Sequence, residues 1–111
     1  MTREEAIQEI VRRLVEFYQP ERIYLLGSSA RGDCGPDSDL DFCVVVPDYA
    51  PEELMRSGEI YSKLGNTGYP KDVIPWRSSD FDARAMHVVA SLPATIIREG
   101  RLIYDARTVA A

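Results

Sequence analysis

Between residues 2 and 20, the apolar positions follow the spacing of an amphipathic helix. Thr2 and Glu5 form a capping-box pattern at its start, and Pro20 ends it. The residues that recur on one helical face are Ile7, Ile10, Val11, Leu14, Val15 and Tyr18. This pattern predicts a first helix with one apolar face.

Four short runs of apolar, β-branched and aromatic residues predict strands over residues 22–26, 40–46, 71–76 and 101–105. Pro75 lies within the third run and indicates an edge strand or an abrupt end, because proline cannot donate to a sheet ladder. Helical patterns come between the later runs. The chain therefore has the alternation of an α/β (α+β) domain.

Three further helices are predicted from their boundaries. Proline and two glutamates open a helix within residues 51–64. Ser79 with Asp82 predicts the cap of a helix that runs from residue 80 towards 89. Serine and proline open the last helix within residues 91–100, which a glycine closes.

Length and composition indicate a single domain over residues 1–106, followed by a frayed tail over 107–111. The 111 residues are 45% hydrophobic and 28% charged, which is ordinary for a soluble globular protein. No apolar run approaches the length of a membrane span, and the N-terminus resembles a helix start more than a signal peptide. We expect a cytoplasmic protein with no membrane partner. Cys34 and Cys43 lack metal-site spacing and are expected to be free thiols.

Thirteen basic and eighteen acidic residues give a net charge of −5. This balance argues against direct binding of nucleic acid through its phosphates. Four of the acids lie close together in the sequence, at Asp33, Asp37, Asp39 and Asp41. Bound cations would offset this local excess, and a protein or small molecule is the expected partner.

The chemistry of the chain centres on a small-residue turn and a carboxylate pair. Gly27 and Ser28 follow the first strand, and Asp39 and Asp41 open the second. Alternate residues of a strand share a face, so the two aspartates point the same way with their backbones about 7 Å apart. They can hold divalent cations, while the Gly27 backbone and the Ser28 hydroxyl can cradle phosphate oxygens. Together they predict a metal and nucleoside triphosphate site.

Each piece also has a structural interpretation. A Gly-Ser pair after a strand is most often a plain turn, and aspartates in loops are most often solvent-exposed residues of caps and turns. Two aspartates on one strand face repel each other, however, so their combination calls for a compensating positive charge. The combination favours the metal site. Arg31 fits two roles, contact with the triphosphate or pairing with a loop aspartate.

The run Gly27-Ser28-Ser29-Ala30-Arg31-Gly32, then Asp33 and Ser38-Asp39-Leu40-Asp41, resembles the signature of the DNA polymerase beta-like nucleotidyltransferases, above all the minimal nucleotidyltransferases. The resemblance implies their fold, a small mixed β-sheet flanked by helices. It also implies a third carboxylate on a later strand. Asp72 is the candidate, with Asp80 and Asp82 as nearby alternatives.

The same resemblance implies a reaction in which a hydroxyl attacks the α-phosphate of ATP. Asp39 and Asp41 would hold two Mg²⁺ ions, with Mn²⁺ as an alternative, and would share one of them with Asp72. Asp72 would also take the proton of the hydroxyl. Gly27 and Ser28 would position the phosphates.

The acceptor is implied by analogy alone. Minimal nucleotidyltransferases are commonly paired with a helical HEPN-type toxin, which they neutralise as antitoxins by adding AMP to a tyrosine. Two alternatives are a binding module that blocks its partner without catalysis, and a stand-alone enzyme acting on a small molecule such as an aminoglycoside. The base preference, the acceptor residue and the oligomeric state do not follow from these residues.

Overall fold

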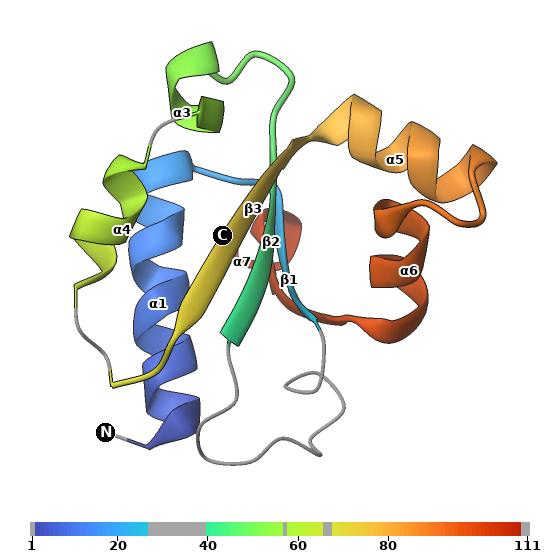
Figure 1. Cartoon of the computed structure of the whole chain (residues 1–111). Helices are drawn as coiled ribbons and strands as arrows, with labels where there is room; N and C mark the ends of the chain where they lie inside the picture. Colours follow the sequence, from blue (N-terminus) through green and yellow to red (C-terminus); the bar gives the residue numbers. More distant parts are fainter. Residues whose placement is uncertain (1, 27–39, 57, 66–67, 110–111) are drawn as a thin grey trace.

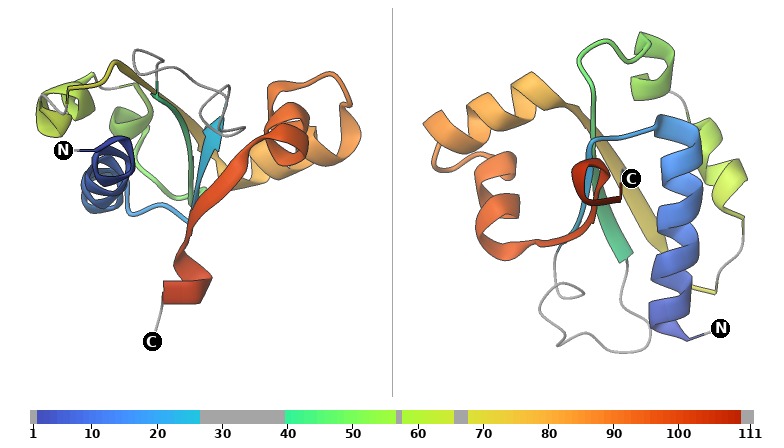
Figure 2. Two further views of the ribbon diagram at one scale, coloured as in Figure 1. Left: turned by 90° about the horizontal axis from the view of Figure 1, so that it is seen from below. Right: turned by 180° about the vertical axis from the view of Figure 1, so that it is seen from behind.

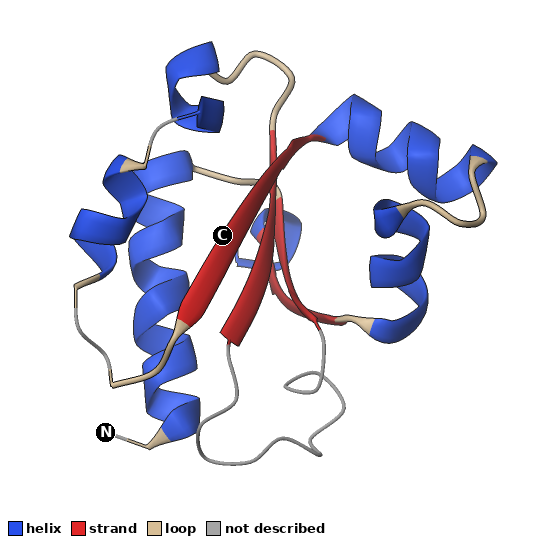
Figure 3. Ribbon diagram, in the orientation of Figure 1, coloured by secondary structure: helices blue, strands red, loops and turns tan. Residues whose placement is uncertain are grey.

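The computed structural model of the chain describes residues 2–26, 40–56, 58–65 and 68–109. Its centre is a sheet of four strands in the order β3-β2-β1-β4. The strands are β1 (Arg22–Leu26), β2 (Leu40–Val46), β3 (Lys71–Arg77) and β4 (Arg101–Asp105). β1 is antiparallel to β2 and β4, whereas β2 and β3 are parallel. The sheet is therefore mixed, and helices flank it on both faces as expected (Figures 1 and 3).

One face of the sheet is covered by α1 (Arg3–Tyr18) and α4 (Glu59–Leu64), as the views in Figure 2 show. The helix α1 forms where its apolar spacing predicts it. Thr2 and Glu5 form the capping box, with the Glu5 N–H donating to Thr2 Oγ1 over 3.1 Å. The helix ends at Gln19, whose φ of 49° is left-handed, just before Pro20. Its buried residues are Ala6, Ile7, Ile10, Leu14 and Tyr18.

The opposite face is covered by α5 (Ser78–His87) and α6 (Leu92–Glu99), which pack mainly against each other. Phe81 is the buried residue of α5, where it stacks on Tyr24 of β1 with ring centroids 5.6 Å apart. The α6 boundaries agree with the prediction, because the Ser91 side chain accepts from the Ala94 N–H and Gly100 is the C-cap.

The strand β2 lies between the two helical layers and is buried along most of its length. By strand alternation, Leu40, Phe42 and Val44 face α1 and α4, while Cys43 and Val45 face α5 and α6. The third strand, β3, is an edge strand, as Pro75 predicted, and the Tyr61 hydroxyl accepts the backbone N–H of Val73 on it.

The helix predicted within residues 51–64 is divided into two short helices, α3 (Glu52–Arg56) and α4. The chain bends at Gly58, which directly precedes α4 and has no side chain that could cap it. Glycine is a poor helix former because its backbone loses the most freedom, so a break there has a physical reason.

The prediction for the start of α5 was also wrong. This helix begins at Ser78, and Ser79 does not cap it through its side chain. The backbone N–H of Ser79 instead donates to Asp48 Oδ1 over 2.9 Å, so a carboxylate from the loop after β2 takes the capping role.

Regular structure extends beyond β4 into the stretch predicted to fray. Residues Ala106–Val109 form the short helix α7, where the Thr108 hydroxyl donates to the Asp105 carbonyl over 2.8 Å. Asp105 is buried and pairs with Arg107. In the part of the chain that the structure describes, no helix is long and apolar enough to cross a membrane.

Candidate functional site

Two of the predicted carboxylates are brought together by the pairing of β2 and β3. In this parallel ladder Asp41 lies directly opposite Asp72. Neighbouring strands are about 4.8 Å apart, and residues that pair in register point to the same face. Asp41 is half-buried and Asp72 is exposed. The sheet thus presents two adjacent carboxylates at one end.

The carboxylate pair lies on the face of the sheet that α5 and α6 cover at its other end. Asp41 shares its face with Cys43 and Val45, which pack under Phe81 and Ile96. On the other neighbouring strand, Leu26 is the partner of Asp41. The pair therefore occupies the end of this face where β1 finishes and β2 and β3 begin (Figure 1).

The other predicted site residues are Gly27, Ser28, Arg31 and Asp39, and they lie outside the described residues. Their roles stay predictions. Among the residues that are described, no group of three or more potential metal-binding side chains occurs. The pair of Asp41 and Asp72 alone is nevertheless of the right chemistry, because carboxylate oxygens are the ligands that hard divalent cations such as Mg²⁺ take.

The two alternative third carboxylates lie elsewhere. Asp80 pairs with Arg84 over 3.1 Å and Asp82 with Arg22 over 2.7 Å, both on α5. This helix follows the far end of β3, which is roughly 17 Å from Asp72 for a strand of this length. Asp72, and neither Asp80 nor Asp82, is the residue that the fold sets against Asp41.

Two cations near the start of β3, Lys71 and Arg3, make contacts with Tyr69 that were not predicted. Lys71 directly precedes Asp72, and its Nζ donates to the Tyr69 carbonyl over 3.3 Å. The Arg3 guanidinium, at the start of α1, lies over the Tyr69 ring at 5.4 Å from its centroid. Lys71 could have been noted from its place beside Asp72, whereas the approach of Arg3 follows only from the packing of α1.

Cys43 shares the face of Asp41 but is not a reactive thiol. Burial raises the pKa of the Cys43 thiol to about 12, which the nearby Arg22 charge only partly offsets. At neutral pH the sulfur is protonated, so it is a free but inert thiol. Cys34 lies outside the described residues. His87 is exposed near the end of α5.

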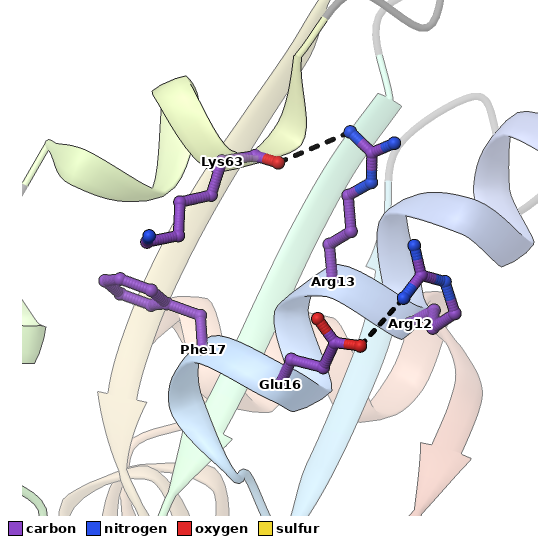
Figure 4. A pocket seen from close by; sticks show the side chains of 5 residues that line it. All are labelled: Arg12, Arg13, Glu16, Phe17 and Lys63. Carbon is purple, nitrogen blue, oxygen red and sulfur yellow. Dashed lines mark hydrogen bonds and ion pairs between the residues drawn. The ribbon is translucent and has the colours of Figure 1, made fainter.

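A cleft of about 520 Å³ lies on the other side of the sheet, where α1 approaches α4. Figure 4 shows its lining residues, Arg12, Arg13, Glu16, Phe17 and Lys63. Arg12 pairs with Glu16 over 2.7 Å, and Arg13 donates to the Lys63 carbonyl over 3.3 Å (Figure 4). Both arginines also hold Glu9, whose pKa their hydrogen bonds lower to about 2. The sheet separates this cleft from the carboxylate pair. The two arginines of the cleft form ion pairs within α1, and Arg13 also joins α1 to α4.

The family model of the nucleotidyltransferase domain matches residues 7–102 of the chain. The chain belongs to this family. The matched span contains Asp41 and Asp72 together with every strand that positions them. The match identifies a transferase of the polymerase beta-like superfamily, for which a nucleotide substrate and a divalent metal are the general expectation.

A solved structure supports the fold of this nucleotidyltransferase. The present chain is similar to the crystal structure of a candidate nucleotidyltransferase from Sulfolobus solfataricus, with a TM-score of 0.57 and 18% sequence identity. The match covers 93% of this chain and 80% of that one. No curated protein matches the chain. The small mixed sheet flanked by helices, predicted from the polymerase beta-like signature, is thereby confirmed.

Proposed function

We propose that this nucleotidyltransferase transfers AMP from ATP to a hydroxyl group, a tyrosine, on a HEPN-type toxin and so acts as its antitoxin. The observation that carries the catalytic part is the register that sets Asp41 against Asp72. The nature of the partner rests on the resemblance to minimal nucleotidyltransferases.

The carboxylates have distinct roles in this proposal. Asp41, together with Asp39, would bind Mg²⁺ that accompanies the triphosphate, and Asp72 would share a second ion. When bound, these ions neutralise charge that develops on the phosphates during transfer. Gly27 and Ser28 would hold the phosphates, and Arg31 would either assist them or pair with a loop aspartate.

Asp72 is the residue best suited to receive the acceptor. It lies on β3, which is an edge strand, and its side chain is exposed, whereas Asp41 on the neighbouring inner strand is half-buried. A hydroxyl on another molecule can therefore approach Asp72 from the open edge. Asp72 would accept the proton of that hydroxyl as it attacks.

Charge is compatible with a basic protein as the acceptor. The net charge of −5 favours association with a positively charged surface, such as that of an RNA-cleaving enzyme.

The test combines the purified protein with a HEPN-type toxin encoded beside it, if the adjacent gene carries one, together with ATP and Mg²⁺, and follows that toxin by intact mass spectrometry. We expect the partner to gain the mass of AMP residues and to lose its toxicity. Asp41→Asn should prevent both. Asp80→Asn, which removes an exposed carboxylate from α5, should leave both intact and is the control. If Asp41→Asn still silences a partner that carries no nucleotide, the protein is an antitoxin that acts by binding alone.

A further inference from the structure

Asp72 lies near the start of a strand that the rest of the described sheet holds from one side. β3 is an edge strand, and β2 is its neighbour in the ladder. A proton acceptor must stay within hydrogen-bond reach of the hydroxyl it serves, and a displacement of about 1 Å can slow a reaction about a hundredfold. The position of Asp72 therefore depends on what holds the outer edge of β3.

A tyrosine holds this outer edge next to Asp72. The Val73 N–H donates to Tyr61 Oη over 3.1 Å. In a parallel ladder the backbone groups of successive residues point alternately toward and away from the neighbouring strand. Because the Val73 groups point outward, those of Asp72 point toward β2. Pro75, the next outward residue, has no N–H and needs no acceptor there. Tyr61 thus satisfies the outward donor that directly follows Asp72.

Tyr61 itself lies on a helix that is fixed to the core. Its neighbours in α4, Ile60 and Leu64, are buried. The Arg13 guanidinium of α1 donates to the carbonyls of Lys63 and Leu64 at the end of α4, the first over 3.3 Å (Figure 4). The Tyr61 hydroxyl therefore joins the edge of the sheet to a helix that α1 holds in place.

Tyr61 approaches the strand from the side that the Asp72 carboxylate does not face. Val73 packs in the cluster beneath α1 and α4, whereas Asp72 shares the other face with Asp41. The Val73 nitrogen is about 2.4 Å from the Asp72 Cα across the peptide bond, so Tyr61 Oη lies within about 5.5 Å of that Cα. The hydroxyl therefore acts on the backbone of Asp72 and not on a substrate.

We propose that Tyr61 is a positioning residue for Asp72. By holding the Val73 N–H, its hydroxyl keeps the Asp72 carboxylate opposite Asp41, where it can share a metal ion and receive the proton of the attacking hydroxyl. This inference rests on the role proposed above for Asp72, and it does not depend on which molecule supplies that hydroxyl.

The contact should affect transfer more than binding. Without it, the start of β3 opens more often, and the Asp72 carboxylate spends less time in the position that transfer requires. ATP is proposed to bind through the metal ion at Asp41, on the inner strand β2. Loss of the Tyr61 hydroxyl therefore lowers the rate of transfer and leaves the affinity for ATP nearly unchanged.

Two variants test the contact itself. Tyr61→Phe removes the hydroxyl and keeps the ring. Tyr49→Phe, at a tyrosine that is 88% exposed in the loop after β2, removes the same group beyond the opposite end of that strand and is the matched control. Hydrogen exchange of the Val73 amide, followed by NMR, should be about tenfold faster in Tyr61→Phe and unchanged in Tyr49→Phe. Equally slow exchange in both variants and the wild type would overturn the proposal. Circular dichroism establishes that each variant is folded.

Release of pyrophosphate from ATP and Mg²⁺ tests the role, because every nucleotidyl transfer produces it, whether the acceptor is the partner or water. We expect kcat to fall about tenfold in Tyr61→Phe with KM for ATP changed by no more than about twofold, and Tyr49→Phe to match the wild type. An unchanged kcat, or an equal loss of affinity for ATP, would overturn the proposal. A wild type that releases pyrophosphate but modifies no toxin would contradict the proposed partner, and the two variants would still decide the role of Tyr61.

Discussion

The two faces of the sheet differ in how completely helices cover them. Among the described residues, the face beneath α1 and α4 contributes to a cluster of 14 buried residues, whereas the cluster beneath α5 and α6 has 5. The first face is covered along its length by α1. Of the helices that the structure describes, α5 and α6 cover one end of the second face, and Asp41 and Asp72 lie at its other end.

The two faces therefore have different roles: one stabilises the fold, and the other carries the carboxylates of the candidate site. Apolar residues on the fully covered face remove their surface from water and hold the strands in register. The second face carries the half-buried Asp41 and the exposed Asp72, where we propose that metal ions and a nucleotide bind. Because β2 contributes to both faces, alternate residues of one strand serve the two purposes, as Phe42 and Asp41 do.

The largest effect on stability is expected from the fully covered face. Phe42 is completely buried in β2, and Phe42→Ala should lower the free energy of unfolding by about 3–5 kcal/mol, because it removes contacts and leaves a cavity. Urea unfolding followed by circular dichroism measures this. Phe17→Ala, at a partly buried position of α1, is the control and should cost less. Equal losses would mean that the core is not centred on β2.

Cys43 reports on the covered part of the other face. In a Cys34→Ser background, alkylation of the native protein at pH 8 should be about a thousandfold slower than that of a free thiol, because burial raises the pKa of Cys43 to about 12. Its rate should increase with pH and rise steeply on addition of urea. Rapid labelling of the folded protein would show that α5 and α6 do not exclude solvent from this face.

The cap of α1, the helix on the fully covered face, is expected to contribute less to the free energy of unfolding than Phe42 does. Thr2→Ala should destabilise the protein by about 1 kcal/mol, because the Glu5 N–H loses its acceptor and the capping box is broken. A thermal melt of the variant measures the change. Ser62→Ala, at an exposed position of α4, provides the comparison and should have almost no effect. An unchanged melting temperature for Thr2→Ala would indicate that the first turn of α1 contributes nothing to stability.

The smallest effect on stability is expected at the end of the sheet that carries the carboxylate pair. Asp72 is exposed, and Asp72→Asn should change the free energy of unfolding by no more than about 0.5 kcal/mol. The same variant should lose nucleotide transfer, since it removes the proposed proton acceptor. Both are measured on one preparation, by urea unfolding and by the partner's mass. A strongly destabilised Asp72→Asn protein would assign this carboxylate a structural role.

Features set by neighbouring residues could be predicted from the sequence. The helix α1, its capping box, the bounds of β1 and β2 and the Ser91 cap of α6 all depend on local spacing and agree with the structure. The start of α5 could not be predicted in this way, because its cap is supplied by Asp48, 31 residues earlier in the chain than Ser79.

In the candidate site, too, local features could be predicted from the sequence, whereas contacts between distant residues could not. A shared strand face for Asp39 and Asp41 is a prediction from the period of a strand and lies partly outside the described residues, whereas the partner of Asp41 depends on the register between β2 and β3. Three aspartates, at 72, 80 and 82, were compatible with the sequence. Only the parallel pairing of the two strands sets Asp72 against Asp41.

The most direct test of the carboxylate site is calorimetric titration with ATP, in Mg²⁺ and in excess chelator. The carboxylates would repel the phosphates without cations, so we predict binding by the wild type only when Mg²⁺ is present. Asp41→Asn should lose this binding, and Asp72→Asn should keep much of it while losing transfer. Equal affinity for ATP with and without chelator, or unchanged Mg²⁺-dependent binding by Asp41→Asn, would contradict the assignment of this site.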